Sequence, residues 1–335
     1  MTKRSRTPWG RLPAAVVTLA VAAPLAACGS QASTSTSSGG GARITVLRST
    51  GAIFEPLYIA QQQGYFKDAG LDVSVKAGAP DTSQNAPSVL NGEAQFAMTD
   101  GSGFLKGAAK KLPIRMVSGL VSSTAKGART EGLLVKKGSP IKRFADLEGK
   151  TVGLPALGGN VHFVAEYLVE KDGGDPSKVK FVALPVTSLN DAVSTGKIDA
   201  AYTFGAFYAA GQATGLRSMG NGMNELPGIP QGVLFSSQKY LSANAATAKK
   251  FIDAIAKALT YANEHPDAVK TIDKKYTQLP ADYIDKSSIA HYDKNINTTL
   301  VRTMITKMNE YGLLTSAPKD DALYWNQAPT VTSSS

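Results

Sequence analysis

The sequence of 335 residues predicts an α/β fold with mainly parallel sheets, built as two lobes of similar construction. First, short segments rich in β-branched residues alternate with segments of helical periodicity, and strands that alternate with helices pair in parallel. Second, residues 91–101 (NGEAQFAMTDG) align without a gap with residues 195–205 (TGKIDAAYTFG). Each copy is typical of a helix end, a strand and a Thr-x-Gly loop, although small residues are common enough here for a chance match.

The first half of the chain supplies three expected strands, at residues 43–47, 71–76 and 94–99. The first two, RITVL and LDVSVK, alternate apolar and polar positions as half-buried strands do. A helix is expected to begin at Pro56, because proline is favoured in a first turn, and to end at Gly64 with a left-handed cap. A short turn at 65–70 and a helix at 81–92 follow.

The second half repeats the alternation of strands and helices. Strands are expected at residues 130–137, 150–155, 179–184 and 198–203, and helices at 160–171, 189–195, 245–265 and 298–312. The helix at 245–265 has its apolar residues on one face, and Pro266 ends it. That face comprises Phe251, Ile252, Ile255, Leu259 and Ala262.

The first 27 residues are typical of a secretory signal peptide. MTKRSRTPWGR carries four basic residues and no acid, and the apolar run after it is shorter than the ~20 residues of a spanning helix. A weak membrane-anchor helix is the alternative. The segment ends in Leu25-Ala26-Ala27-Cys28, which resembles a bacterial lipobox, and Cys28 is the only cysteine. This resemblance implies that Cys28 begins the mature chain and carries the lipid anchor, which holds firmly with two acyl chains.

A tether and a basic charge follow from composition. Residues 28–42 contain no large apolar side chain, so we expect a flexible spacer of roughly 20 Å. The net charge is +10, of which four charges lie in the signal peptide, leaving 10 − 4 = +6. The basic residues are scattered and no nucleic-acid motif accompanies them, so a nucleic-acid partner is not expected.

The stretch PLYIAQQQGYFKDAGLDVSV resembles the opening of one group of periplasmic binding proteins, which serve ABC importers of aliphatic sulfonates, taurine, nitrate and thiamine precursors. The family pattern falls here on Pro56, Ala60, Gly-Tyr-Phe at 64–66 and Gly-Leu-Asp-Val at 70–73. Two further stretches match, DLEGKTVGLP from Asp146 and GKIDAAY from Gly196, and the resemblance covers roughly residues 43–320.

The resemblance implies a two-lobed periplasmic binding protein fold of type II, with two hinge crossings and solute held between the lobes. The expected organisation is a signal peptide at 1–27, a tether at 28–42, lobe I at 43–130 and 232–325, lobe II at 131–231 and a disordered tail at 326–335. The crossings are expected near residues 131–135 and 232–235. Trp325 adjoins the tail and is not expected to line a pocket.

The implied function is that of an extracytoplasmic solute-binding component, exported and lipid-anchored to the outer face of the cell membrane. It would capture a small organic anion or zwitterion of the sulfonate, taurine and nitrate class for an ABC permease and its ATPase. The same fold could instead bind a thiamine pyrimidine precursor or an aromatic acid, or present solute to a membrane receptor as a sensor. An enzyme like the eukaryotic pyrimidine synthase is disfavoured, because its cysteine-rich motif is missing.

The candidate ligand-binding residues lie in loops that follow predicted strands. They are Ser49, Thr50, Phe54, Thr82, Thr99, Asp100, Ser102, Gly158, Gly159, Asn160, His162, Thr203, Phe204 and Phe207. Helix starts at Thr82 and Gly159 favour an anion, because their first backbone N–H groups are free. The Asp100 carboxylate would repel an anion, unless it caps the next turn, binds a ligand amine or pairs with a cation. Each residue also has an ordinary structural reading as a turn, an N-cap or core packing.

Neither a metal nor a cofactor is expected. His162, His265 and His291 stand far apart, without carboxylates at ligand spacing. GKT at 149–151 lacks the earlier glycine of a phosphate-binding loop, and GSG at 101–103 lacks the spacing of a dinucleotide fingerprint.

Overall fold

The structure is a computed structural model, and it describes residues 41–49, 53–79, 81–124, 131–220, 222–277 and 280–332. Residues 40–335 form one compact unit. The predicted signal peptide, nearly all of the predicted tether, Cys28 and Thr50 lie outside the described residues. None of the helices in the described ranges is long and apolar enough to cross a membrane.

Lobe I is built on a five-stranded sheet of order β2-β1-β3-β10-β4. Its strands are β1 (Ala42–Arg48), β2 (Leu71–Ala77), β3 (Phe96–Thr99), β4 (Ile114–Ser122) and β10 (Pro230–Ser237). β1 pairs in parallel with β2 and β3, whereas β10 pairs antiparallel with β3 and β4. Four strands therefore share one direction and β10 opposes them, which agrees with the predicted, mainly parallel α/β sheet.

Lobe II repeats this topology in a sheet of order β7-β6-β8-β5-β9. Its strands are β5 (Glu131–Lys136), β6 (Thr151–Leu154), β7 (Lys180–Ala183), β8 (Ala200–Phe204) and β9 (Leu216–Ser218). β5 is the strand that opposes the others. The sequence repeat falls on β3 and β8, which hold the same third place in their sheets, and the glycines before them, Gly92 and Gly196, have φ of 81° and 79°.

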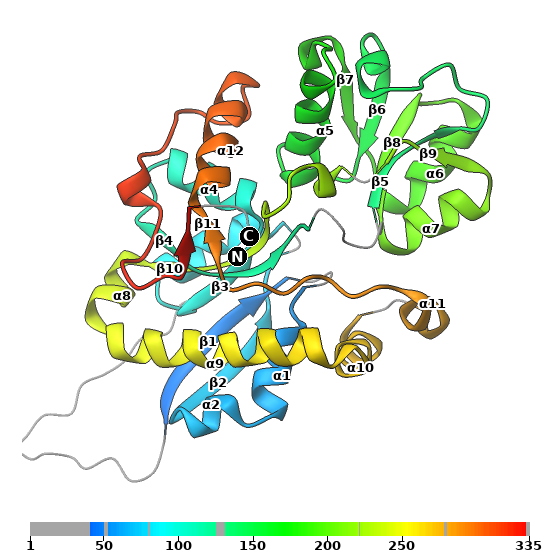
Figure 1. Cartoon of the computed structure of the whole chain (residues 1–335). Coiled ribbons are helices and arrows are strands. Elements are labelled where there is room, and N and C mark those ends of the chain that lie inside the picture. Colours follow the sequence, from blue (N-terminus) through cyan, green and yellow to red (C-terminus); the bar gives the residue numbers. More distant parts are fainter. Residues whose placement is uncertain are drawn as a thin grey trace, which may run out of the picture. The chain divides into compact units, whose positions relative to one another are not determined.

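Helices cover the sheet of lobe I. They are α1 (Glu55–Gln62), α2 (Tyr65–Asp68), α3 (Ala86–Leu90), α4 (Gly101–Ala109), α8 (Gln238–Ala243), α9 (Ala245–Glu264), α10 (Pro266–Tyr276), α11 (Ala281–Lys286) and α12 (Thr298–Glu310). The predicted apolar face of α9 is buried along its length, and α9 lies along this lobe beside α1 (Figure 1). Gly64 ends α1 in the left-handed region, as expected.

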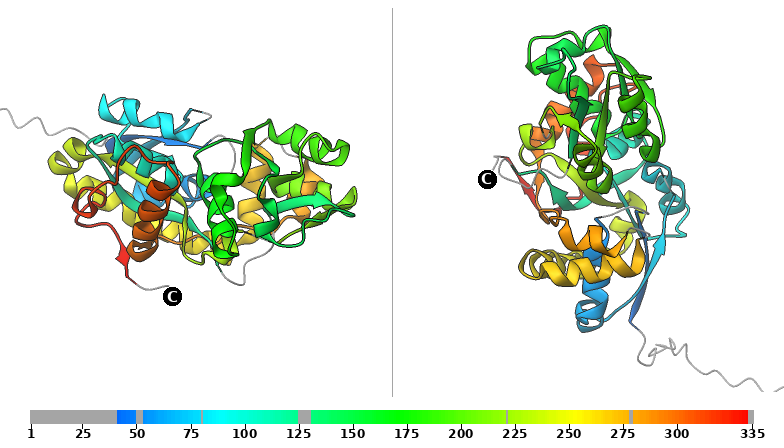
Figure 2. Two further views of the ribbon diagram at one scale, coloured as in Figure 1. Left: turned by 90° about the horizontal axis from the view of Figure 1, so that it is seen from above. Right: turned by 90° about the vertical axis from the view of Figure 1, so that its right-hand side faces the viewer.

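Lobe II carries α5 (Asn160–Lys171), α6 (Val186–Thr195) and α7 (Gly205–Ala213). The bounds of α5 are those that the sequence predicts. α5 packs beside α12 and α4 of lobe I (Figures 1 and 2). One hydrophobic cluster accordingly runs through both lobes, with Phe104 and Met304 from lobe I and Leu154 and Phe163 from lobe II. The lobes are therefore packed against each other as well as covalently linked.

The two crossings between the lobes lie earlier in the chain than the sequence suggests. β4 of lobe I ends at Ser122 and β5 of lobe II begins at Glu131, while β9 of lobe II ends at Ser218 and β10 of lobe I begins at Pro230. The expected positions, 131–135 and 232–235, fall inside β5 and β10, because each crossing ends where one of these antiparallel strands begins. Ser123 joins the crossings: its amide donates to the Ile229 carbonyl (3.3 Å) and its carbonyl accepts from the Gly228 amide (2.7 Å).

The carboxyl-terminal segment is ordered where a disordered tail is expected. β12 (Thr330–Val331) pairs in parallel with β11 (Ile296–Asn297). Just before it, the Met116 amide donates to the Leu323 carbonyl, and the Trp325 amide donates to the Met116 carbonyl. These bonds cover the outer edge of β4. An edge strand left uncovered could pair with another chain, so this cover protects the protein from such pairing. Backbone hydrogen bonds hold this segment in place. Because such bonds do not depend on apolar side chains, the polar composition of the segment does not predict that it is ordered.

Candidate functional site at the junction of the lobes

Asn160, the first residue of α5, connects the two lobes through its side chain. Its Oδ1 accepts from the Ser102 amide (2.9 Å) and from the Ser102 hydroxyl (2.7 Å), and its Nδ2 donates to the Pro230 carbonyl (2.9 Å). Asn160 and Ser102 are 5% and 0% exposed. The amide thus ties the start of α5 to the start of α4 and to the first residue of β10, beside the return crossing.

Asp100 lies at the same place, as the N-cap of α4. Its Oδ1 accepts from the Gly103 amide at 2.6 Å. Its Oδ2 lies 3.7 Å from the position that a Cβ on Gly159 would occupy, so the carboxylate also faces the start of α5. Burial raises the pKa of Asp100, while the Gly103 amide, the charge of Lys106 and the Asn160 amide act in the opposite direction. The capping role is the first of the alternatives that the sequence leaves open.

Lys106 on α4 brings a positive charge to this junction. Its Nζ lies 3.1 Å from the position that a Cβ on Gly158 would occupy, so a lobe I ammonium reaches a lobe II loop. Burial is the largest influence on the pKa of Asp81, Asp100 and His162, and the charge of Lys106 is a smaller one that acts to lower each pKa. Among the described residues, the Lys106 ammonium makes no hydrogen bond or ion pair. The ammonium therefore lies where lobe I contacts the loop before α5.

The loop before α5 is fixed from behind by His162. The imidazole Nδ1 accepts from the Gly158 amide at 2.9 Å, and Gly158 has φ of 76°, which favours glycine. The Nε2 atom faces Glu166 at 3.7 Å, and burial, followed by the Lys106 charge, lowers the pKa of His162 to about 4. Burial raises the pKa of Glu166 to about 8. The Gly158 amide therefore already has a hydrogen-bond acceptor. An anion at this end of α5 could bind only backbone N–H groups of the residues that follow Gly158.

In lobe I, a strained residue precedes α1. Ile53 has φ of 65°, which is an outlier for a β-branched residue. Its amide donates to the Glu55 carboxylate at 3.0 Å, and Tyr292 donates its hydroxyl to the other Glu55 oxygen at 3.0 Å. Burial, and next the charge of Asp273, raise the pKa of Glu55. Burial thus favours the protonated form of Glu55, which holds the Ile53 turn. Backbone strain of this kind clusters at ligand-binding sites.

A second contact between the lobes lies along α5 and α12. Glu170 of α5 accepts from the Lys307 ammonium at 2.5 Å and from the Tyr311 hydroxyl, both of lobe I. These bonds lower the pKa of Glu170, with Lys307 contributing most. Because these groups are partly exposed, the ion pair contributes little by itself. Together with the buried contact of α5 with α12, it braces one side of the junction.

The predicted site residues divide by their exposure. Phe54, Thr99, Ser102, Asn160, His162 and Thr203 are buried, Phe204 is exposed, and Ser49, Thr82, Asp100, Gly158, Gly159 and Phe207 are half-buried. The structure brings together Asp100, Ser102, Gly158, Gly159 and Asn160. Phe54 packs in the lobe I core under the Arg48 guanidinium, 4.3 Å from its ring centre. The Thr203 hydroxyl is buried and, among described residues, unpartnered.

Sequence reasoning missed Lys106 and Leu157. Lys106 lies on α4, a glycine-rich helix that the sequence analysis does not predict. Leu157 precedes Gly158 in a loop that the sequence analysis interprets through its glycines, as a site where backbone N–H groups bind an anion. No spacing in the sequence places Lys106 near the loop, because its approach to Gly158 depends on how the two lobes pack.

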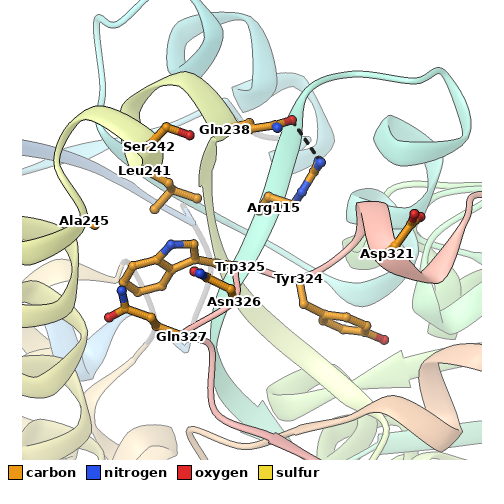
Figure 3. Close-up of a pocket in the computed structure, with 10 residues that line it drawn as sticks. All are labelled: Arg115, Gln238, Leu241, Ser242, Ala245, Asp321, Tyr324, Trp325, Asn326 and Gln327. Atoms are coloured by element: carbon orange, nitrogen blue, oxygen red, sulfur yellow. Dashed lines mark hydrogen bonds between the residues drawn. The ribbon is translucent and has the colours of Figure 1, made fainter.

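A pocket of about 430 Å³ lies on lobe I, away from the junction (Figure 3). Its lining includes Arg115 near the start of β4, Leu241 of α8 and Trp325. Because ligand loops follow the other ends of these strands, the pocket lies at the opposite edge of the sheet. Arg115 donates to the Gln238 side chain at 2.9 Å, as the dashed line in Figure 3 marks. Trp325 therefore does line a pocket, contrary to expectation, because its segment is held against β4.

We predict that Asn160→Ala destabilises the protein although alanine favours helices. The change leaves the Ser102 amide and the Pro230 carbonyl buried without their partner, which costs about 2–4 kcal/mol of unfolding free energy. Urea unfolding measures this loss, and Asn309→Ala at the exposed end of α12 is the control. Equal stability of both variants would mean that the Asn160 bonds do not hold the lobes together.

A second prediction concerns pH. A raised carboxyl pKa means that the folded state holds a proton that the unfolded state releases, so the stability from Glu55 is present at acidic pH and is lost as pH rises. Between about pH 5 and about pH 9, Glu55→Gln should lose less unfolding free energy than the wild type. The exposed Glu93→Gln should follow the wild type. Parallel pH profiles of the wild type and Glu55→Gln would contradict a protonated Glu55.

Solved structures share this fold. The periplasmic aliphatic sulphonate binding protein SsuA of Escherichia coli matches with a TM-score of 0.71 and 17% identity, over 86% of this chain and 98% of that one. The alkanesulfonate-binding protein SsuA of Xanthomonas axonopodis pv. citri, bound to MOPS, matches with a TM-score of 0.66 and 15% identity, over 85% and 99% of the two chains. The fold is therefore that of the periplasmic binding proteins.

Sequence comparisons agree with this assignment of the fold. A protein of Bacillus subtilis (strain 168), described as "Putative binding protein YtlA", is 27% identical over 264 residues, which cover 75% of this chain and 76% of that protein. Residues 52–269 match the family model described as NMT1/THI5 like. That match spans both lobes and most of the junction residues, and the chain belongs to the NMT1/THI5-like family.

Proposed function

We propose that the protein is the extracytoplasmic solute-binding component of an ABC importer, which holds a small organic anion or zwitterion between its lobes and delivers it to the permease. The observation that carries this proposal is the meeting of Lys106, Asp100 and the start of α5 at the junction of the lobes. The sulfonate-binding proteins that share the fold support the same class of ligand. The protein acts by binding rather than by catalysis.

The charges at the junction suit a ligand with an acidic group. The Lys106 ammonium faces Gly158, and α5 has no side chain cap at Gly159. An anion near both would meet a full positive charge and the positive end of a helix dipole. The second charge of a zwitterion would meet the Asp100 Oδ2, which lies on the α5 side of the carboxylate. Closure of the lobes on such a ligand requires that it bind the closed state more tightly.

The test begins with a thermal-shift screen of alkanesulfonates, taurine, nitrate, pyrimidines and aromatic acids. A bound compound should raise the melting temperature, with about 2.7 kcal/mol of stabilisation at a hundredfold excess over its dissociation constant. Calorimetry on the best compound then compares variants. Lys106→Gln should weaken binding roughly 10- to 150-fold, the worth of a charged hydrogen bond of about 1.5–3 kcal/mol.

Two further variants make this test specific. Lys110→Gln removes the same charge from the exposed end of the same helix and should leave the affinity unchanged. Asp100→Asn keeps a good N-cap residue and removes only the negative charge, so it should weaken a zwitterion and tighten a simple anion. Binding unaffected by Lys106→Gln would move the site away from this junction, and no shift with any compound would count against the proposed ligand class.

We also propose that the protein is exported and anchored to the outer face of the membrane by a lipid on Cys28. The lipobox-like Leu25-Ala26-Ala27-Cys28 and the apolar-poor tether support this, and such a spacer would let the binding domain reach the permease. Replacement of Cys28 by Ala should release the protein from the membrane fraction, whereas the tether variant Ser30→Ala should stay bound. Retention of the Cys28→Ala protein in washed membranes would exclude this anchor.

A further inference from the structure

Two large hydrophobic side chains stand out on the surface of the described residues. Leu157 and Phe204 are 47% and 41% exposed, and they are the large hydrophobic residues recorded as exposed there. Neither belongs to the hydrophobic clusters of the cores. Exposed apolar area of this size is unremarkable when it is scattered, so the placement of the two residues decides its meaning.

Both residues lie at the same edge of lobe II. Leu157 is in the loop after β6, and Phe204 is the last residue of β8. β6 and β8 are neighbours that pair in parallel, with Val152 opposite Ala200. Their carboxyl ends therefore meet at one edge of the sheet, which is where ligands bind in open α/β sheets.

This edge adjoins the polar part of the junction. Leu157 is followed in the chain by Gly158, which faces the Lys106 ammonium. Next to Phe204, the Tyr283 hydroxyl of lobe I lies 2.9 Å from the position that a Cβ on Gly205 would occupy. Lobe I side chains thus lie against the glycines that directly follow Leu157 and Phe204, and a molecule held there would contact charged and apolar groups at once.

We propose that Leu157 and Phe204 select the ligand, by contacting the apolar body of an amphipathic organic anion whose acidic group meets Lys106. This inference rests on the proposed function and narrows it. The ligand class becomes an acid or zwitterion with an alkyl or aromatic body of several carbons. Inorganic oxyanions and the shortest organic acids satisfy the charged half of the site and leave the apolar half exposed to water.

The affinity for a homologous series measures this directly. Calorimetry with linear alkane-1-sulfonates from methane to octane, and with nitrate, should give an increase of about fourfold per added methylene until the surface is covered. Benzenesulfonate should bind more tightly than methanesulfonate for the same reason. Nitrate should bind more weakly than every sulfonate that reaches Leu157.

The variants separate the two halves of the site. Leu157→Ser combined with Phe204→Ser should reduce the gain per methylene to less than half, while the affinity for methanesulfonate stays within about twofold of the wild type. Leu90→Ser, at the half-buried end of α3 in lobe I, makes the same chemical change outside the junction and should keep the full gain. Melting temperatures of all variants confirm that they are folded.

Each other outcome contradicts a defined part of the argument. If short and long anions bind equally well, or the double variant keeps the wild-type gain, the apolar selection is wrong and the proposed function stands. If no compound binds, including those of the wider screen, the proposed function fails and this inference fails with it. If sedimentation shows a wild-type dimer that the double variant lacks, Leu157 and Phe204 form an interface between copies and not a ligand surface.

Discussion

The amide side chain of Asn160 is the constraint on which the arrangement of this site depends. It makes three hydrogen bonds, two with Ser102 and one with Pro230, at a buried point where two helix starts and a crossing meet. The amide offers an acceptor and a donor on one rigid plane without a charge, whereas an ionised carboxylate offers only acceptors and could not donate to the Pro230 carbonyl. Through this side chain, the first turn of α5 is fixed relative to α4, and the positions of Lys106 and Gly158 follow.

The electrostatics of the junction are those of a site that is partly desolvated before any ligand enters. Burial raises the pKa of Asp100 and Glu55 and lowers that of His162, so burial opposes the charged form in each case. Lys106 differs, because it projects from a half-buried position toward the opposite lobe. A ligand anion near Gly158 would therefore meet the Lys106 ammonium beside groups that are buried or already hydrogen-bonded.

The backbone around the site is arranged to keep these groups in place. Ile53 is held in a left-handed conformation by Glu55, and its side chain packs so closely on Gly232 that a Cβ there would come within 2.5 Å of the Ile53 Cδ1. In lobe II, the His162 imidazole accepts a hydrogen bond from the Gly158 amide and so fixes that loop. Both loops are thus fixed by bonds from behind, which spares the ligand part of the entropy cost of ordering them.

The sequence by itself determined the class of fold, the two-lobed repeat and most elements with a clear period, such as α5 and the apolar face of α9, because local periodicity reflects burial of one face. It did not reveal β4 and β10, whose residues are buried on both faces and show no alternation, nor α4 and α7, which are rich in glycine and alanine. It placed Asp100, Ser102, Gly158, Gly159 and Asn160 in the site, but it assigned Asn160 to the ligand. Only the tertiary structure decided that this amide joins the lobes, that Lys106 and Leu157 lie beside it, and that residues 326–332 pair with the fold. Such roles depend on contacts between residues far apart in the chain, and no local pattern encodes them.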